Sequence, residues 1–161
     1  MPTNTPPILN VTLYQPDIAQ NLGAVMRSCS CFDVQLGVIE PCGFPLTAKG
    51  LRRTAMDYGA PSNLIRHKTW ETFQNRPESG RTVLFTTKGA TPLTDFVFQP
   101  NDTLLFGRES AGVPEEVHAS VDERIIIPIA KGARSFNLSV SVAVAMFEAL
   151  RQLESLPKAT S

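Results

Sequence analysis

Three short turns of this chain are suited to bind a ligand through main-chain groups. They comprise residues 86–89 (TTKG), 106–109 (FGRE) and 127–129 (IPI), and each lies at the end of an apolar run that predicts a β-strand. In open α/β sheets ligands bind at the carboxyl ends of the strands, and glycine lets the backbone approach a ligand because it has no Cβ. The sequence lacks G-x-G-x-x-G and G-x-x-x-x-G-K-[ST], so neither dinucleotide nor phosphate-loop binding has its usual signature.

Five polar residues accompany these turns. Asn21 and Arg27 are six residues apart in a predicted helix, Glu109 ends the second turn, and Ser135 and Asn137 precede an apolar run. Each has an ordinary explanation when considered alone, because asparagine and serine often cap helices and charged side chains often lie at the surface. Considered together, they form an unusual set beside the predicted binding turns.

Alternating strand and helix patterns predict the elements that position these residues. Strands are expected at 8–14, 34–40, 63–68, 82–87, 102–107 and 124–129. Helices are expected from Asp17 through Cys31, within 47–59, at 70–76, and from about Ser135 to Leu153. Asp17 and Gln20 have the spacing of a capping box for the first helix. The alternation predicts an α/β fold, a single domain 1–161 with a mostly parallel sheet and helices on both faces.

Composition bounds the class of protein. The chain has 161 residues, of which 42% are hydrophobic and 19% charged, as in ordinary globular domains. The formal net charge is zero, which argues against a strongly electrostatic nucleic-acid binder, although the basic clusters at 52–53 and 66–68 weakly favour RNA. The N-terminus does not resemble a signal peptide, and no apolar run reaches the roughly 20 residues of a membrane helix. We therefore expect a cytoplasmic protein without a membrane segment.

Metal binding is not expected. Cys29, Cys31 and Cys42 are odd in number and lack the C-x₂-C spacing of a zinc site, and only His67 and His118 could join them. We expect these cysteines to be reduced and structural.

The segment Leu138–Met146 is apolar on nearly all sides of the predicted last helix. Such a helix does not face solvent, and a small domain can hardly enclose a terminal helix completely. We therefore expect a subunit interface, most simply in a two-fold dimer.

The motifs resemble those of a known family. N-x-G-x-x-x-R (21–27), LLFGRESAGVP (104–114) and IPIAKGARSFNLSVSVAVAMFEALRQ (127–152) are similar to the three motifs of the SpoU branch of the SPOUT methyltransferases. The segments IEPCGFP, LRRTAMDYG and TTKG resemble the tRNA (cytidine/uridine-34) 2′-O-methyltransferases more specifically. The resemblance covers nearly the whole chain. It implies a deep trefoil knot over about 82–155 and a homodimer formed through the last and first helices.

The resemblance also implies a cofactor, S-adenosylmethionine (AdoMet), with S-adenosylhomocysteine as product and no metal. The residues matching the family's cofactor contacts are Phe85, Thr86, Gly89, Gly107, Ile127, Ile129, Ser135 and Leu138. Those matching its catalytic set are Asn21, Arg27, Glu109, Ser135 and Asn137. The implied reaction is in-line displacement at the methyl group by a ribose 2′-oxygen. Because a guanidinium stays protonated, we expect Arg27 to orient the ribose or phosphate and stabilise the developing alkoxide, held by Glu109 and Asn21.

The implied partner is the anticodon stem-loop of tRNA, whose single-stranded bases and phosphates suit protein recognition. The candidate phosphate contacts are Arg52, Arg53, Arg66 and Lys88. Relatives often carry a tyrosine where this chain has Phe147, a departure that bears on substrate choice or rate. The alternatives are a 2′-O-methyltransferase for another tRNA position or for rRNA, an idle dimeric RNA-binding scaffold, and an unrelated enzyme for a small phosphorylated ligand.

Overall fold

The computed structural model describes residues 7–47, 49–50, 64–77, 80–88 and 90–159. Within these residues the chain forms a seven-stranded sheet in the order β3-β2-β1-β6-β4-β7-β5, in which every pair is parallel. The strands are β1 (Leu9–Tyr14), β2 (Gln35–Ile39), β3 (Leu64–His67), β4 (Thr82–Phe85), β5 (Thr91–Pro92), β6 (Asp102–Phe106) and β7 (Glu123–Ile126). The helices are α1 (Ala19–Phe32), α3 (Trp70–Gln74), α4 (Glu115–Ser120) and α5 (Leu138–Gln152), with a 3₁₀ turn at Leu93–Asp95.

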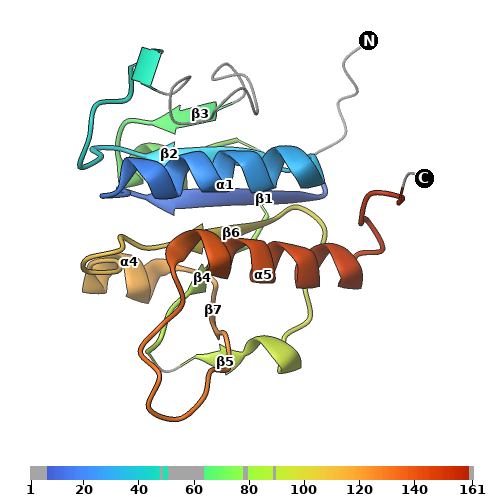
Figure 1. Ribbon diagram of the computed structural model, residues 1–161. Helices are drawn as coiled ribbons and strands as arrows, with labels where there is room; N and C mark the ends of the chain where they lie inside the picture. Colours follow the sequence, from blue (N-terminus) through green and yellow to red (C-terminus); the bar gives the residue numbers. More distant parts are fainter. Residues whose placement is uncertain (1–6, 48, 51–63, 78–79, 89, 160–161) are drawn as a thin grey trace.

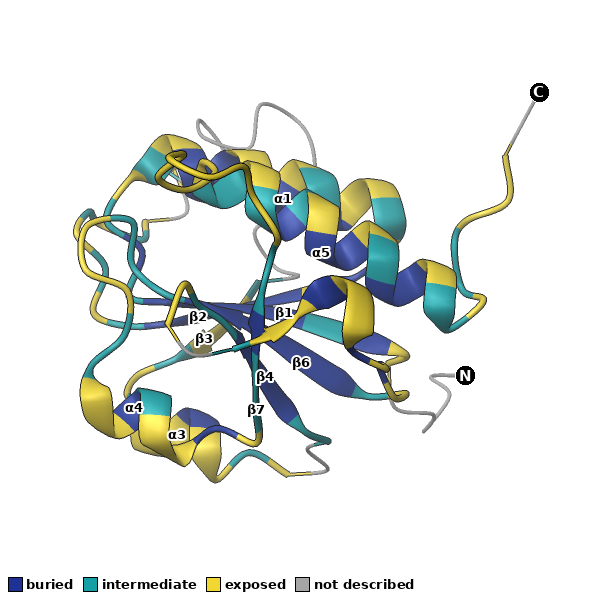
Figure 2. Cartoon of the chain, turned by 90° about the horizontal axis from the view of Figure 1, so that it is seen from below, coloured by how far each residue is buried: buried dark blue, intermediate teal, exposed yellow. Residues whose placement is uncertain are grey.

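Helices cover both faces of the sheet, as the sequence predicted (Figure 2). α1 and α5 lie side by side on one face, and α3 and α4 lie on the other (Figures 1 and 2). Alternate residues of β1 divide the core, because Leu9, Val11 and Leu13 pack with the α1–α5 layer while Tyr14 packs with Phe73 of α3. The predicted α/β class is confirmed, and within the described residues the sheet is wholly parallel.

The central strands end level with one another. Leu13 of β1 and Phe85 of β4 both pair with Phe106 of β6, and Phe85 also pairs with Ile125 of β7. The aromatic rings of Phe85 and Phe106 stack with centroids 4.8 Å apart. The segments that leave these strands therefore start from one edge of the sheet, which brings the three predicted turns together.

Both helix starts differ from the sequence prediction. α1 begins at Ala19 with Ile18 as its N-cap residue, and no side chain caps it in the manner of the predicted Asp17–Gln20 capping box. The Asp17 carboxylate instead accepts hydrogen bonds from Ser110, 93 residues away. α5 begins at Leu138 rather than at Ser135, because Asn137 is its N-cap residue and accepts a 2.9 Å hydrogen bond from the Ser139 amide.

Short elements account for the other differences. β5 and α4 were not predicted, and α3 is shorter than the predicted 70–76 helix. The helix predicted within 47–59 falls almost wholly outside the described residues. No helix among the described residues is long and apolar enough to cross a membrane. No cluster of three or more potential metal ligands occurs among them, and their three cysteines form no disulfide.

A buried ion pair joins β6 to the start of β4. The Asp102 side chain is 1% exposed, and both of its oxygens accept hydrogen bonds from Arg81 at 2.9 and 2.8 Å. The Gln99 amide donates a further 2.8 Å bond to the same carboxylate. The bonds that Arg81 donates to Asp102 raise the pKa of Arg81. The pair satisfies a buried charge at the amino end of the sheet, opposite the edge that carries the predicted turns.

Candidate functional site

A cavity of about 570 Å³ lies at the carboxyl ends of β4, β6 and β7. Its walls include residues 86–88 after β4, part of the segment 107–113 after β6 and part of the segment 127–138 after β7. The predicted cofactor-binding residues that line it are Phe85, Thr86, Gly107, Ile127, Ile129, Ser135 and Leu138. The eighth, Gly89, lies outside the described residues. The structure thus gathers the three turns around one space, large enough for a small organic ligand.

Two of the predicted polar residues meet where α1 and α5 begin. Asn137 donates a 3.2 Å hydrogen bond from Nδ2 to Oδ1 of Asn21, and both side chains line the cavity. Because Oδ1 of Asn137 also caps α5, its amide is fixed at both ends. Asn21 is 8% exposed although it is polar. The pair holds the first turns of the two helices together at the mouth of the cavity.

The loop after β6 is a tight turn that presents Glu109. Arg108 and Gly112 exchange backbone hydrogen bonds of 3.0 and 2.9 Å across the turn. Gly112 has a positive φ of 62°, and a Cβ on Gly107 would lie 2.6 Å from the Gly112 carbonyl carbon, so the turn requires glycine at both positions. Glu109 stands at the tip of this turn and lines the cavity.

The Glu109 carboxylate contacts the start of α1. Its Oε2 accepts hydrogen bonds from the backbone amides of Ile18 at 2.7 Å and Asp17 at 3.0 Å. Its Oε1 is buried and has no hydrogen-bond partner among the described residues. Burial raises the pKa of Glu109, and the two backbone bonds partly oppose that rise. The site therefore contains one buried carboxylate oxygen that a ligand donor could satisfy.

Arg27 lies apart from the cavity lining. It is an exposed residue of α1, six positions beyond Asn21. At about 100° per residue, six positions place the two side chains roughly 120° apart around the helix axis. Asn21 faces the cavity, whereas Arg27 lies on the outer side of α1, as do Ala24 and Cys31. The structure brings together Asn21, Glu109, Ser135 and Asn137, and it leaves Arg27 on a neighbouring surface.

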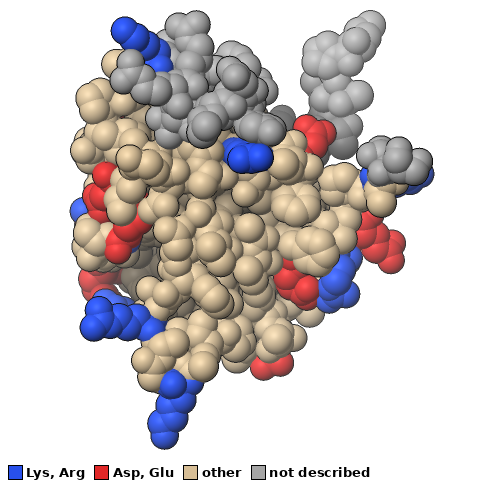
Figure 3. Space-filling view, in the orientation of Figure 1, with Lys and Arg blue, Asp and Glu red and all other residues tan. Residues whose placement is uncertain are grey.

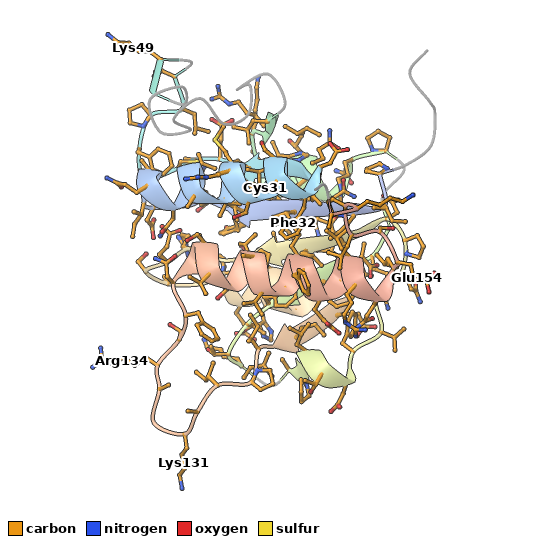
Figure 4. The ribbon with its side chains drawn as sticks, turned by 45° about the vertical axis from the view of Figure 1, so that its right-hand side comes forward. Cys31, Phe32, Lys49, Lys131, Arg134 and Glu154 are labelled. Carbon is orange, nitrogen blue, oxygen red and sulfur yellow. The ribbon has the colours of Figure 1, made fainter. Side chains whose placement is uncertain are left out.

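The predicted RNA contacts are distributed differently. Lys88 lines the cavity. Arg66 forms a bidentate ion pair with Glu40, at 2.6 and 3.3 Å, and also donates to the Leu46 carbonyl, which gives it a structural task. Arg52 and Arg53 lie outside the described residues. Lys131 and Arg134 point outward from the exposed loop between β7 and α5 (Figure 4), and sequence reasoning had not selected them.

Sequence reasoning also missed the wall that α4 provides. Val113, Glu115 and His118 line the cavity, and Nε2 of His118 is buried without a hydrogen-bond partner among the described residues. A signal was present, since Pro114 followed by two glutamates is typical of the first turn of a helix.

A parallel sheet whose strand-end segments enclose one cavity, with a half-buried carboxylate and two side-chain amides beside it, defines an α/β protein built to bind a ligand. The SpoU rRNA Methylase family matches residues 8–147, and the chain belongs to this family. The resemblance read from the three motifs is thereby confirmed.

Individual relatives match nearly the whole chain. A tRNA (cytidine(34)-2'-O)-methyltransferase of Beijerinckia indica subsp. indica is 49% identical over 150 residues, which cover 92% of this chain and 94% of the relative. A structure that addresses 2-OH methylation of C/U34 on tRNA superposes with a TM-score of 0.84 at 39% identity and covers 93% of this chain and 99% of that one. An AdoMet-bound rRNA methyltransferase of Sinorhizobium meliloti shares the fold, with a TM-score of 0.79 at 23% identity over 92% of this chain and 58% of its own.

Proposed function

We propose that this protein transfers a methyl group from AdoMet to the ribose 2′-oxygen of nucleotide 34 in tRNA. The observation that carries the proposal is the 49% identity to a tRNA (cytidine(34)-2'-O)-methyltransferase over 94% of that relative's length. The rRNA methyltransferase of the same fold is a longer chain, of which this protein spans 58%. At 23% identity that likeness shows the fold alone, so the choice of tRNA over rRNA rests on the position-34 relative.

The cavity suits the proposed cofactor. Phe85, Ile127, Ile129 and Leu138 give it apolar walls, while Thr86, Ser135 and main-chain groups supply hydrogen-bond partners. These are the features of a site for a nucleoside with an uncharged base. The unpartnered Oε1 of Glu109 adds a buried acceptor at the wall. We assign AdoMet binding to the residues that line this cavity. Gly89, which lies outside the described residues, remains a predicted contact.

Side chains of this protein would position the nucleotide for methyl transfer. When bound, AdoMet supplies an electrophilic methyl group on a sulfonium. The ribose 2′-oxygen would form the new bond to the methyl carbon as the carbon–sulfur bond breaks, and the hydroxyl proton would leave to solvent. We assign Arg27 the task of orienting the ribose and stabilising negative charge on its oxygen, because a guanidinium donates and does not accept a proton. Asn21, Ser135 and Asn137 would position the nucleotide at the mouth.

We include a homodimer in this proposal. Val140, Val144 and Phe147 are 44%, 39% and 49% exposed along one side of α5, next to the outer side of α1. The rings of Phe147 on α5 and Phe32 on α1 pack edge to face, with their centroids 6.3 Å apart. This contact makes the exposed sides of the two helices one continuous surface. The space-filling view from this side shows a largely uncharged surface over the two helices, with charged side chains mainly near its edges (Figure 3). A two-fold partner on this surface would carry its own Arg27 toward the neighbouring cavity.

Replacing Val144 with glutamate tests the dimer. A buried charge that faces its own copy across a two-fold axis costs several kcal/mol, so the dimer dissociation constant is expected to rise at least about 100-fold. Light scattering after size-exclusion chromatography would show a dimer for the wild type and a monomer for the variant. The control is Val97→Glu, because Val97 is 74% exposed and does not lie on either helix. A variant that stays dimeric at low micromolar concentration would contradict the proposed interface.

Three further features belong to the proposal. The trefoil knot over about 82–155 is supported by the strand order β6-β4-β7 and by the meeting of three strand-end segments at one cavity. The protein is proposed to act as one domain in the cytoplasm, where tRNA is modified. Contacts to the anticodon stem-loop are assigned to Arg52, Arg53 and Lys88, with Lys131 and Arg134 added because they stand exposed on a loop beside the cavity.

The first experiment is transfer of labelled methyl from AdoMet to unmodified bulk tRNA and, in parallel, to rRNA, followed by nuclease mapping of the labelled nucleotide. Label at the ribose of nucleotide 34 is the expected result. Label at another tRNA position or in rRNA would show a 2′-O-methyltransferase with a different RNA target and overturn the assignment to nucleotide 34. Tight AdoMet binding without transfer to any RNA would support an idle scaffold and overturn the proposal.

A further inference from the structure

The start of α1 and the turn after β6 are joined by two carboxylates that cross in opposite directions. Glu109, on the turn, accepts from the backbone amides of Asp17 and Ile18. Asp17, at the start of the helix, accepts from the backbone amide of Ser110 at 3.2 Å and from its hydroxyl. Each segment therefore donates backbone hydrogens to a side chain of the other. We call Asp17, Ile18, Glu109 and Ser110 the carboxylate clamp.

We propose that Asp17 is a positioning residue for methyl transfer, which through Ser110 fixes the start of α1 to the wall of the cofactor cavity. This inference rests on the proposed function. Asp17 lies outside the predicted site and does not line the cavity. It acts through other residues, because α1 carries Asn21 about one turn beyond the clamp and Arg27 in its third turn.

The clamp satisfies the backbone amide of the N-cap residue of α1, Ile18, which has no partner within the helix. The first amides of a helix have no partners within the helix, and a side chain at the N-cap position usually satisfies one of them. Ile18 occupies that position in α1 and has no polar side chain. We therefore infer that the direction of α1 at its start depends on the bonds between residues 17–18 and the turn. The bonds from Ser110 lower the pKa of Asp17, so the carboxylate stays ionised.

The turn is rigid enough to serve as an anchor. Arg108 and Gly112 are hydrogen-bonded across it, and a Cβ added to Gly107 would lie only 2.6 Å from the Gly112 carbonyl carbon. Glu109 and Ser110 stand at its tip, while Gly107 and Gly112 form part of the cavity wall. α1 is also held from a second direction, because its Asn21 is hydrogen-bonded to Asn137 at the start of α5. The first turn of α1 is thus held between two walls of the cavity, which sets Asn21 directly, and Arg27 through the helix, relative to a bound cofactor.

Asp17→Ala is the test variant, and Asp95→Ala is its control because Asp95 is an exposed acidic residue of the 3₁₀ turn beyond β5. Misplacing a reacting group by a fraction of an ångström lowers turnover while leaving binding intact, so we expect kcat to fall on the order of tenfold in Asp17→Ala. The KM for tRNA and the Kd for AdoMet should stay within about twofold of those of the control.

Two further variants separate positioning from general damage. Ser110→Thr keeps the hydroxyl and should retain wild-type kcat, whereas Ser110→Ala should lose part of it. The double variant Asp17→Ala/Ser110→Ala should be no slower than Asp17→Ala alone, because both changes remove the same contact. Additive losses, a kcat equal to that of Asp95→Ala, or a parallel loss of AdoMet affinity would each overturn the proposal.

A readout without turnover distinguishes failure of the clamp from failure of the proposed function. In the absence of AdoMet and RNA, amide hydrogen exchange at Ser110 and at residues 19–22 should be faster in Asp17→Ala than in Asp95→Ala. If the wild type transfers no methyl group but this exchange difference appears, the proposed function fails and the clamp stands as a structural contact. If exchange is unchanged, the clamp is wrong whatever the activity.

Discussion

Replacing Arg27 with alanine is expected to lower kcat for methyl transfer by roughly 100-fold to 1000-fold, the usual effect of removing one donor to a developing oxyanion. Arg27 is exposed on α1 and does not line the cavity of its own chain. AdoMet affinity should therefore stay unchanged. Arg27→Lys should recover only part of the rate, because a single ammonium cannot reproduce the planar fork of donors. Single-turnover transfer to tRNA and calorimetric AdoMet titration measure the two quantities.

The matched control for Arg27→Ala is Lys158→Ala, which removes an exposed positive charge near the C-terminus. If both variants slow transfer equally, the effect of Arg27 is a general loss of charge toward RNA. If Arg27→Ala weakens AdoMet binding as much as it slows transfer, Arg27 supports the cavity and does not act on the ribose. Mixed dimers add a sharper measurement: in the proposed dimer, one intact Arg27 should serve only one of the two cavities.

Arg81→Met is expected to lower the free energy of unfolding by about 3–5 kcal/mol, because it leaves the Asp102 carboxylate buried without its partner. Asp102 is 1% exposed on its side chain and receives two bonds from Arg81. The methionine covers a similar surface, so lost packing contributes little. Urea unfolding followed by circular dichroism, at one fixed protein concentration, measures the loss.

The chain offers a matched exposed pair for comparison. Arg151 and Glu148 form a 2.7 Å ion pair on α5, with the arginine side chain 58% exposed. Arg151→Met should cost less than about 1 kcal/mol, as exposed ion pairs usually do. Arg81→Met/Asp102→Asn should recover part of the loss of the single variant, since it removes the unpaired charge. If Arg81→Met and Arg151→Met lowered the free energy of unfolding equally, the larger effect expected for the buried carboxylate would be contradicted.

Sequence patterns predicted the long elements because their signals are local. β1, β2 and β6 are buried on both faces and so read as continuous apolar runs, and α5 reads as an apolar helix. β5 and α4 were not predicted because they have only two and six residues, which are too few to show the hydrophobic periodicity of a strand or a helix. Glycine-containing turns at strand ends predicted the cavity walls, because the carboxyl ends of parallel strands share one edge.

Contacts between distant segments could not be predicted in the same way. The spacing of Asp17 and Gln20 suggested a local capping box, yet the Asp17 carboxylate bonds to Ser110 and Glu109 takes over the amides at the start of α1. A local pattern cannot show which of two acceptors lies nearer in the folded chain. Family resemblance supplied the polar set, but only the structure shows that Arg27 and Asn21 face different sides of α1.

Strand β5 also bears on how copies of this protein can associate. It closes one edge of the sheet with only Thr91 and Pro92, both exposed. Proline has no amide hydrogen to donate, and two residues offer too short a template for another strand. Growth of the sheet from one molecule into the next is therefore blocked at this edge. Open-ended stacking of sheets is therefore not expected at this edge, and the proposed pairing through the helices would leave the edge uncovered without that risk.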